Sequence, residues 1–212
     1  DYGIGSYLRG LIAGLAEIDH DSRYLLLAPA AARDLTGGLP ANFEWIEDES
    51  PPYSWRELVE ISSRVRQLGA GLLHCPHYVV PLAPPCPIVV TLHDTIQLDF
   101  PETLPRPRAL AHGYARVMLS RAARIASRVI AVSEAAAADL ADRLRPARGK
   151  LVVIPNGVHE RFRSDPTLPP APFGHLLFVG NPKPHKNLHR VLRAYARLAL
   201  ERGGSGKPLP PL

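Results

Sequence analysis

The sequence has 212 residues, of which 46% are hydrophobic and 21% are charged, an ordinary composition for a globular protein. This length allows one large domain, or one domain and part of another. The formal net charge is +5, and arginine supplies most of the 25 basic residues, which suits phosphorylated substrates or an anionic membrane surface. Acidic residues are interspersed and no aromatic platform accompanies the basic residues, which argues against a nucleic-acid binder.

The two cysteines, Cys75 and Cys86, lack zinc-finger spacing and are too few for a disulfide framework. They favour a reducing compartment. No run approaches the ~18 apolar residues of a membrane span, and no signal peptide is visible. We therefore expect a cytoplasmic protein. The chain begins at Asp1 rather than Met and closes on the Gly/Pro-rich segment 203–212, so we expect both ends to be cut.

Hydrophobic periodicity predicts that helices and strands alternate along the chain. In chain order it predicts a helix over residues 4–18, strands over 24–28 and 43–46, a helix over 55–68, strands over 72–75 and 87–92, a helix over 105–126, a strand over 128–132, a helix over 133–144 and a strand over 151–154. A proline-rich linker over 165–174 then leads to a new strand over 175–179 and a helix over 188–200.

Strands that are apolar along their whole length are buried on both faces. The alternation therefore predicts an α/β fold with a doubly wound, Rossmann-like parallel sheet. We expect an N-terminal domain over residues 1–164 whose first strand is missing, a linker over 165–174, and only the first strand–helix unit of a second domain over 175–212. Ligands of such sheets bind beyond the carboxyl ends of the strands.

His93 and Asp94 come directly after the most strongly predicted strand. A histidine there can donate to a sugar hydroxyl or relay a proton, and Asp94 can either orient it or cap the next turn. His74 and His77 follow the preceding strand, where a structural role is the simpler interpretation.

A second group of polar residues follows the predicted strand of the second domain. Gly180, Asn181, Lys183 and Lys186 lie between that strand and a helix start, where lysines and backbone N–H groups can hold a diphosphate. A lysine there would neutralise a leaving phosphate. Asn156 closes the last strand of the first domain in a turn.

Two helix starts also carry small polar residues. Gly3, Gly5 and Ser6 open the first helix, where the backbone either approaches an anion or forms a tight turn. Ser133 and Glu134 start a later helix, as a plain cap or as part of the cleft.

Arginines gather on or around the predicted helix over 105–126. They either form a solvated face or make a peripheral contact with the anionic inner face of a membrane. These are Arg106, Arg108, Arg116, Arg121, Arg124 and Arg128.

Five segments stand in a characteristic order: residues 3–7, 91–94, 129–134, 153–158 and 178–188. Together they resemble the retaining glycosyltransferases of the family-4 type (glycosyl transferases group 1), whose GT-B architecture has two facing Rossmann-like domains. Glycogen-synthase-like and mannosyl- or rhamnosyltransferase-like enzymes of polysaccharide assembly are similar.

The resemblance implies transfer of a sugar, with retention, from a nucleotide-diphosphate donor to a saccharide or lipid-linked acceptor. It implies no metal or other cofactor, because basic side chains take over the electrostatic work of a metal. Gly3 and Gly5 would lie near the acceptor and the donor phosphate, His93 at the transferred sugar, and Lys186 on the diphosphate. GDP-mannose is the donor that we prefer by analogy.

Two departures from the family pattern bear on activity. Asn181 stands where the family often has an arginine, with Lys183 as its substitute. The family's pair of donor-binding glutamates is not present up to Leu212, so we expect the chain as given to be inactive.

Two other interpretations stay open. One is a sugar-nucleotide epimerase, for which the required carboxylates are not found. The other is a non-catalytic sugar- or nucleotide-binding module, or a degenerate remnant.

Overall fold

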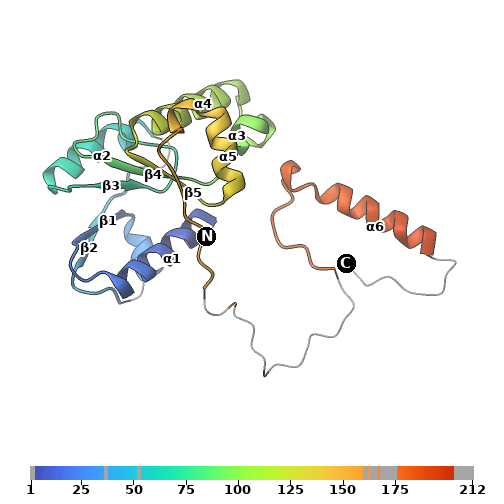
Figure 1. Cartoon of the computed structure of the whole chain (residues 1–212), viewed down its shortest axis with the longest axis horizontal. Helices are drawn as coiled ribbons and strands as arrows, with labels where there is room; N and C mark the ends of the chain where they lie inside the picture. The colour runs from blue at the N-terminus through green and yellow to red at the C-terminus, as the bar shows by residue number, and fades with distance from the viewer. Residues whose placement is uncertain are drawn as a thin grey trace.

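The computed structural model describes residues 3–35, 38–51, 54–159, 162, 167 and 176–202. Helices and strands alternate along most of these ranges, except that β4 follows β3 with no helix between them (Figure 1). The elements are α1 (Gly3–Ile18), β1 (Tyr24–Ala28), η1 (Ala30–Leu35), β2 (Phe43–Glu47), α2 (Trp55–Gln67), β3 (Leu73–Cys75), β4 (Ile88–Leu92), α3 (Ile96–Asp99), η2 (Pro101–Thr103), α4 (Arg108–Ile125), β5 (Arg128–Ala131), α5 (Glu134–Arg143), η3 (Arg145–Ala147), β6 (Leu151–Val153), η5 (Pro184–Lys186) and α6 (Leu188–Arg202).

All strand pairs in the described ranges are parallel, as the apolar strands predict. β3, β4, β5 and β6 form one sheet in that order, and β1 and β2 form a second. The helices α4 and α5 connect β4 to β5 and β5 to β6, which is the crossover pattern of a Rossmann-like α/β fold. The predicted fold class is therefore confirmed, with the difference that the described strands divide between two sheets. The expectation of a further strand ahead of α1 stays a prediction.

The core lies between the four-stranded sheet and α4, which runs along this sheet (Figure 1). Val90 and Val129 are fully buried on the central strands, and Leu119 is fully buried on α4. Ala122 and Ala123 are equally buried and carry so little side chain that the helix backbone can approach the strands closely. Burial of a side chain such as Leu119 contributes about 1.5–3 kcal/mol.

The predicted elements agree with the structure to within a few residues, with two exceptions. The helix predicted over 105–126 begins at Arg108, because Pro107 lacks an N–H and disfavours helical backbone in the residue before it. The strand predicted over 175–179 is wrong for residues 176–179, which form no strand. Leu177 and Val179 are 77% and 84% exposed, and no described strand lies beside them to complete a ladder.

Other predictions lie outside the described residues. His175 is one of them, as is the proposed linker over 165–174 apart from Thr167. The division into two domains therefore stays a prediction. Across the described ranges, no helix has both the length and the apolarity that crossing a bilayer requires.

Two leucines on α4 test where the core lies. We expect Leu119→Ala to lower the free energy of unfolding by about 2–5 kcal/mol, because it removes buried methyl groups and leaves a cavity. Leu110→Ala, on the same helix but 73% exposed, should change it by less than about 0.5 kcal/mol. Urea denaturation followed by circular dichroism measures both, and equal losses would contradict this placement of the core.

Candidate functional site

A cleft of about 1160 Å³ opens at the carboxyl edge of the four-stranded sheet. Its walls come from the start of α1, the residues that end β4, the start of α4, the turn after β6, and residues 181–186. The lining includes seven of the predicted site residues: Gly3, His93, Asp94, Asn156, Asn181, Lys183 and Lys186. Gly5, Ser6, Ser133, Glu134 and Gly180 are not among the lining residues.

His93 is held in one orientation by two neighbours. Its Nε2 atom lies 3.2 Å from the carbonyl oxygen of Pro76. Because a carbonyl only accepts, Nε2 must carry the hydrogen, and in the neutral ring Nδ1 is then the nitrogen with a lone pair. The ring of Tyr7 meets His93 edge to face, with centroids 5.0 Å apart. In the neutral ring these contacts leave Nδ1 as an acceptor, whereas the sequence suggested a donor.

A buried chain of hydrogen bonds lies behind His93. The hydroxyl of Thr91 is 2.9 Å from the Tyr7 hydroxyl and 2.8 Å from Nε2 of His74. Thr91 is fully buried and its hydroxyl has a single hydrogen, so it donates to at most one of these neighbours and accepts from at least one. This chain ties α1 to β3 and β4, and gives His74 the structural role that the sequence favoured.

His77 also lines the cleft, against the ring of Tyr78 at a centroid distance of 3.8 Å. Burial and, to a lesser extent, the nearby His93 lower the pKa of His77 to about 4. The side chain of His77 is therefore neutral at pH 7.

Two other predicted polar residues, Asp94 and Ser133, have contacts of the capping kind. Asp94 Oδ1 accepts from the Ile96 N–H at 3.0 Å, at the start of α3. Ser133 Oγ accepts from the Ala136 N–H at 3.1 Å and caps α5, whose first residue, Glu134, is exposed. These contacts favour the capping alternatives of the sequence analysis, and a catalytic role of Asp94 stays a prediction.

The basic wall of the cleft comes from the residues before α6. Gly180 has φ 153°, a conformation that side chains with a Cβ rarely adopt, and the chain then passes Asn181 and Lys183. Lys186 ends the short η5 turn before Asn187, whose left-handed φ of 55° leads into α6. Both lysines are exposed in the cleft, where an anion is the natural partner.

Two cleft residues escaped the sequence analysis as site candidates. Gln97 Oε1 and His185 Nδ1 are buried atoms that have no hydrogen-bond partner in the described part of the chain. His185 lies near the ring of Phe100, at a centroid distance of 5.9 Å. Buried polar atoms are normally paired, so both atoms are suited to contact a ligand. Gln97 lies three residues after Asp94, and this closeness to the predicted site is the feature of the sequence that could have identified it.

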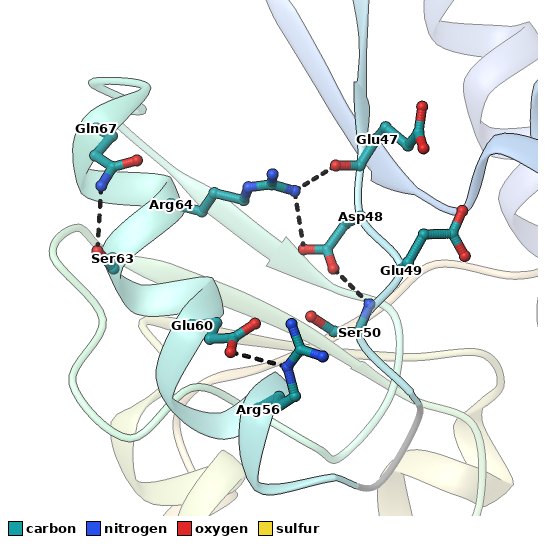
Figure 2. A pocket seen from close by; sticks show the side chains of 9 residues that line it. All are labelled: Glu47, Asp48, Glu49, Ser50, Arg56, Glu60, Ser63, Arg64 and Gln67. Atoms are coloured by element: carbon teal, nitrogen blue, oxygen red, sulfur yellow. Dashed lines mark hydrogen bonds and ion pairs between the residues drawn. The ribbon is translucent and has the colours of Figure 1, made fainter.

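A smaller hollow of about 540 Å³ lies between the end of β2 and α2 (Figure 2). Its polar groups pair with one another: Arg64 contacts the Glu47 carbonyl and the Asp48 carboxylate, and Arg56 pairs with Glu60 at 2.9 Å. The Arg64 contacts fasten the end of β2 to α2, and the Arg56–Glu60 pair lies within α2, so both have a structural role.

A metal site has no support within the described ranges, where no three His, Cys, Asp or Glu side chains converge. The cysteines Cys75 and Cys86 are free thiols. Burial raises the pKa of the Cys75 thiol to about 12, so this thiol is unreactive.

The fold and the cleft define a Rossmann-type α/β protein with a polar, partly basic cleft at the carboxyl edge of a parallel sheet. Residues 2–162 match the family model described as Glycosyltransferase Family 4, and the chain belongs to this family. It is therefore a glycosyltransferase domain. No curated protein and no solved structure matches the chain.

The buried Thr91 hydroxyl gives a stability prediction. Thr91→Val leaves the Tyr7 hydroxyl and His74 Nε2 without this partner, so the free energy of unfolding should fall by about 1–3 kcal/mol. Thr91→Ser keeps the hydroxyl and should therefore retain most of the stability that Thr91→Val loses. Denaturant unfolding of both variants measures it, and a valine variant as stable as the serine variant would contradict the role of the hydrogen-bond chain.

His77 predicts a dependence of stability on pH. Its folded-state pKa of about 4 lies below the ordinary 6.5, so between these values the unfolded chain binds a proton that the folded chain does not. The contribution to stability is complete above about pH 6.5 and is lost as the pH falls towards 4. Its upper limit is about 3 kcal/mol, at ~1.4 kcal/mol per pKa unit. Denaturant titrations at several pH values in this window measure the free energy of unfolding. In His77→Gln this free energy should fall less steeply as the pH is lowered, and an unchanged pH dependence would contradict the role given to His77.

Proposed function

We propose that this chain is the acceptor-side part of a retaining glycosyltransferase. In this proposal it moves a sugar from a nucleotide-diphosphate donor to a hydroxyl of a saccharide or lipid-linked acceptor. The observation that carries the proposal is a single cleft in which the oriented ring of His93 shares the lining with Lys183 and Lys186. Family membership supports sugar transfer in general.

The lysine wall would bind the donor diphosphate. Lys186 is the main partner, with Lys183 and the amide of Asn181 beside it. When the bond from the sugar to the diphosphate breaks, negative charge grows on the leaving phosphate, and an ammonium group placed there stabilises it. We propose that these lysines do the electrostatic work without a metal or another cofactor.

His93 would contact the transferred sugar. With Nε2 bound to the Pro76 carbonyl, Nδ1 is left to accept a hydrogen bond from a sugar hydroxyl. Gln97 and His185 line the same cleft with buried unpartnered atoms, so they are the next candidates for contacts with a polyhydroxyl ligand. We propose a cytoplasmic enzyme and, by analogy alone, GDP-mannose as the donor.

We also propose that the 212 residues as given do not turn over. In the described residues from 176 onward the one carboxylate belongs to Glu201, which pairs with Arg197 at 2.8 Å on α6. No acidic pair is thus available there to hold the ribose and sugar hydroxyls of the donor. Incubation with sugar nucleotides should give no product and only weak binding, and micromolar donor affinity would contradict this proposal.

Binding measurements can separate the two roles in the cleft. By calorimetry with GDP and GDP-mannose, Lys186→Ala should weaken both ligands by about tenfold, the effect of losing a charge-assisted hydrogen bond. His93→Ala should weaken GDP-mannose towards the affinity of GDP and leave GDP unchanged. Arg193→Ala, an exposed cation on α6 outside the cleft lining, is the matched control.

A non-catalytic binding module is the second candidate function. The uncharged Asn181 at an expected arginine position favours a non-catalytic sugar- or nucleotide-binding module. If Lys186→Ala and Arg193→Ala have equal effects, the proposed diphosphate site is wrong. If His93→Ala leaves GDP-mannose affinity intact, His93 does not contact the sugar. In the complete protein, loss of transfer in His93→Ala with the fold intact would support catalysis, and no loss would support the binding module.

A further inference from the structure

The outward side of α4 carries apolar residues that the fold leaves uncovered. Leu110 is 73% exposed and Val117 is 61% exposed. They are seven residues apart, which is about two helical turns, so they lie on one side of the helix. Arg124 continues the same row, and Arg116 lies on its flank, about 100° around the helix from Val117. Both arginines are exposed. We call Leu110, Arg116, Val117 and Arg124 the outer face of α4.

The charge along α4 itself has one sign. No aspartate or glutamate occurs between Glu102 and Glu134 in the sequence. Within the described residues, the side chains of the exposed arginines have no ion pair with a carboxylate, and the partly buried Arg121 binds the Pro81 carbonyl instead, at 2.8 Å. The exposed set comprises Arg106, Arg108, Arg116, Arg124 and Arg128.

The outer face begins at the mouth of the cleft. Leu110 belongs both to this face and to the cleft lining, where Ala111 and Tyr114 of the same helix accompany it. Anything that covers the outer face is therefore next to the entrance of the proposed active site.

A merely solvated helix face does not account for this pattern. Exposed helix positions are ordinarily polar, whereas this face combines bulky aliphatic side chains with unpaired cations. That combination is typical of helices that lie on a membrane, where apolar groups enter the headgroup boundary and cations meet anionic lipids.

We propose that the outer face of α4 docks on an anionic lipid membrane and thereby presents the mouth of the cleft to a lipid-linked acceptor. The exposed residues of α4 support the docking on a membrane, whereas the lipid-linked nature of the acceptor rests on the proposed function. Each basic residue near an anionic surface strengthens binding by about fivefold. Reversal of two charges should thus cost at least about 25-fold.

Vesicle sedimentation tests the docking with the whole chain. The chain should bind phosphatidylcholine vesicles that contain phosphatidylglycerol, bind pure phosphatidylcholine weakly, and lose affinity as salt rises. The double variant Arg116→Glu, Arg124→Glu should lose at least about 25-fold in affinity. Leu110→Ser with Val117→Ser should lose affinity while keeping the salt dependence. The control Arg66→Glu, Arg193→Glu makes the same change in net charge at exposed sites on α2 and α6.

Each outcome bears on the docking surface. Retained binding in the control with loss in the α4 variants supports the proposal, provided that circular dichroism shows all variants folded. Equal losses in both charge variants, or equal binding to neutral and anionic vesicles, would overturn it. If the chain does not bind vesicles but the α4 variants alter its self-association, the outer face of α4 is a protein interface and the membrane proposal is wrong. GDP binding in solution, measured in parallel, shows whether the proposed donor site stands when the docking fails.

Discussion

The hydroxyl of Thr91 is the contact on which the geometry of the cleft depends. It is fully buried near the end of β4, and it reaches Tyr7 on α1 and His74 on β3. A buried hydroxyl without partners is costly, so the three side chains keep one another in place. The same contact brings the ring of Tyr7 against His93, so a stabilising interaction inside the protein also fixes the orientation of a side chain in the cleft.

Electrostatics divides the cleft into two unlike walls. On the sheet side, burial lowers the pKa of His77 and keeps its side chain neutral, and His93 is hydrogen-bonded to the Pro76 carbonyl. On the other side Lys183 and Lys186 are exposed and cationic. A ligand with a charged and an uncharged part fits such a division, and a nucleotide-diphosphate sugar has both. This is why the family and the cleft chemistry support the same proposal.

Much of the fold could be predicted from the sequence because its signals are local. The apolar run that forms β4 placed His93 at a strand end, and Ser133 marked the start of α5. The contact between Tyr7 and Thr91 spans 84 positions, and no periodicity reports such a pairing. The short α3, with Gln97 in it, is too brief to produce a periodic pattern.

The incorrect prediction of a strand over 176–179 also arises because the sequence does not show contacts between distant residues. Its composition is as apolar as that of β1, but a strand exists only when a neighbour completes its hydrogen bonds. Pairing is a tertiary property, and composition alone cannot supply it. The capping contacts of Asp94 show the same limit for the site, because a polar residue after a strand serves local structure or chemistry equally well in sequence.

The two sides of α4 explain why its sequence gives a weak amphipathic pattern. One side buries Leu119, Ala122 and Ala123 against the sheet, and the opposite side exposes Leu110 and Val117. Apolar residues on both sides blur the periodicity that an ordinary surface helix shows. A helix held so firmly by its inner side is a rigid support for its outer side. If the outer face lies on a membrane, the distance from the lipid surface to the cleft mouth is then set by the core of the domain, with no separate docking segment required.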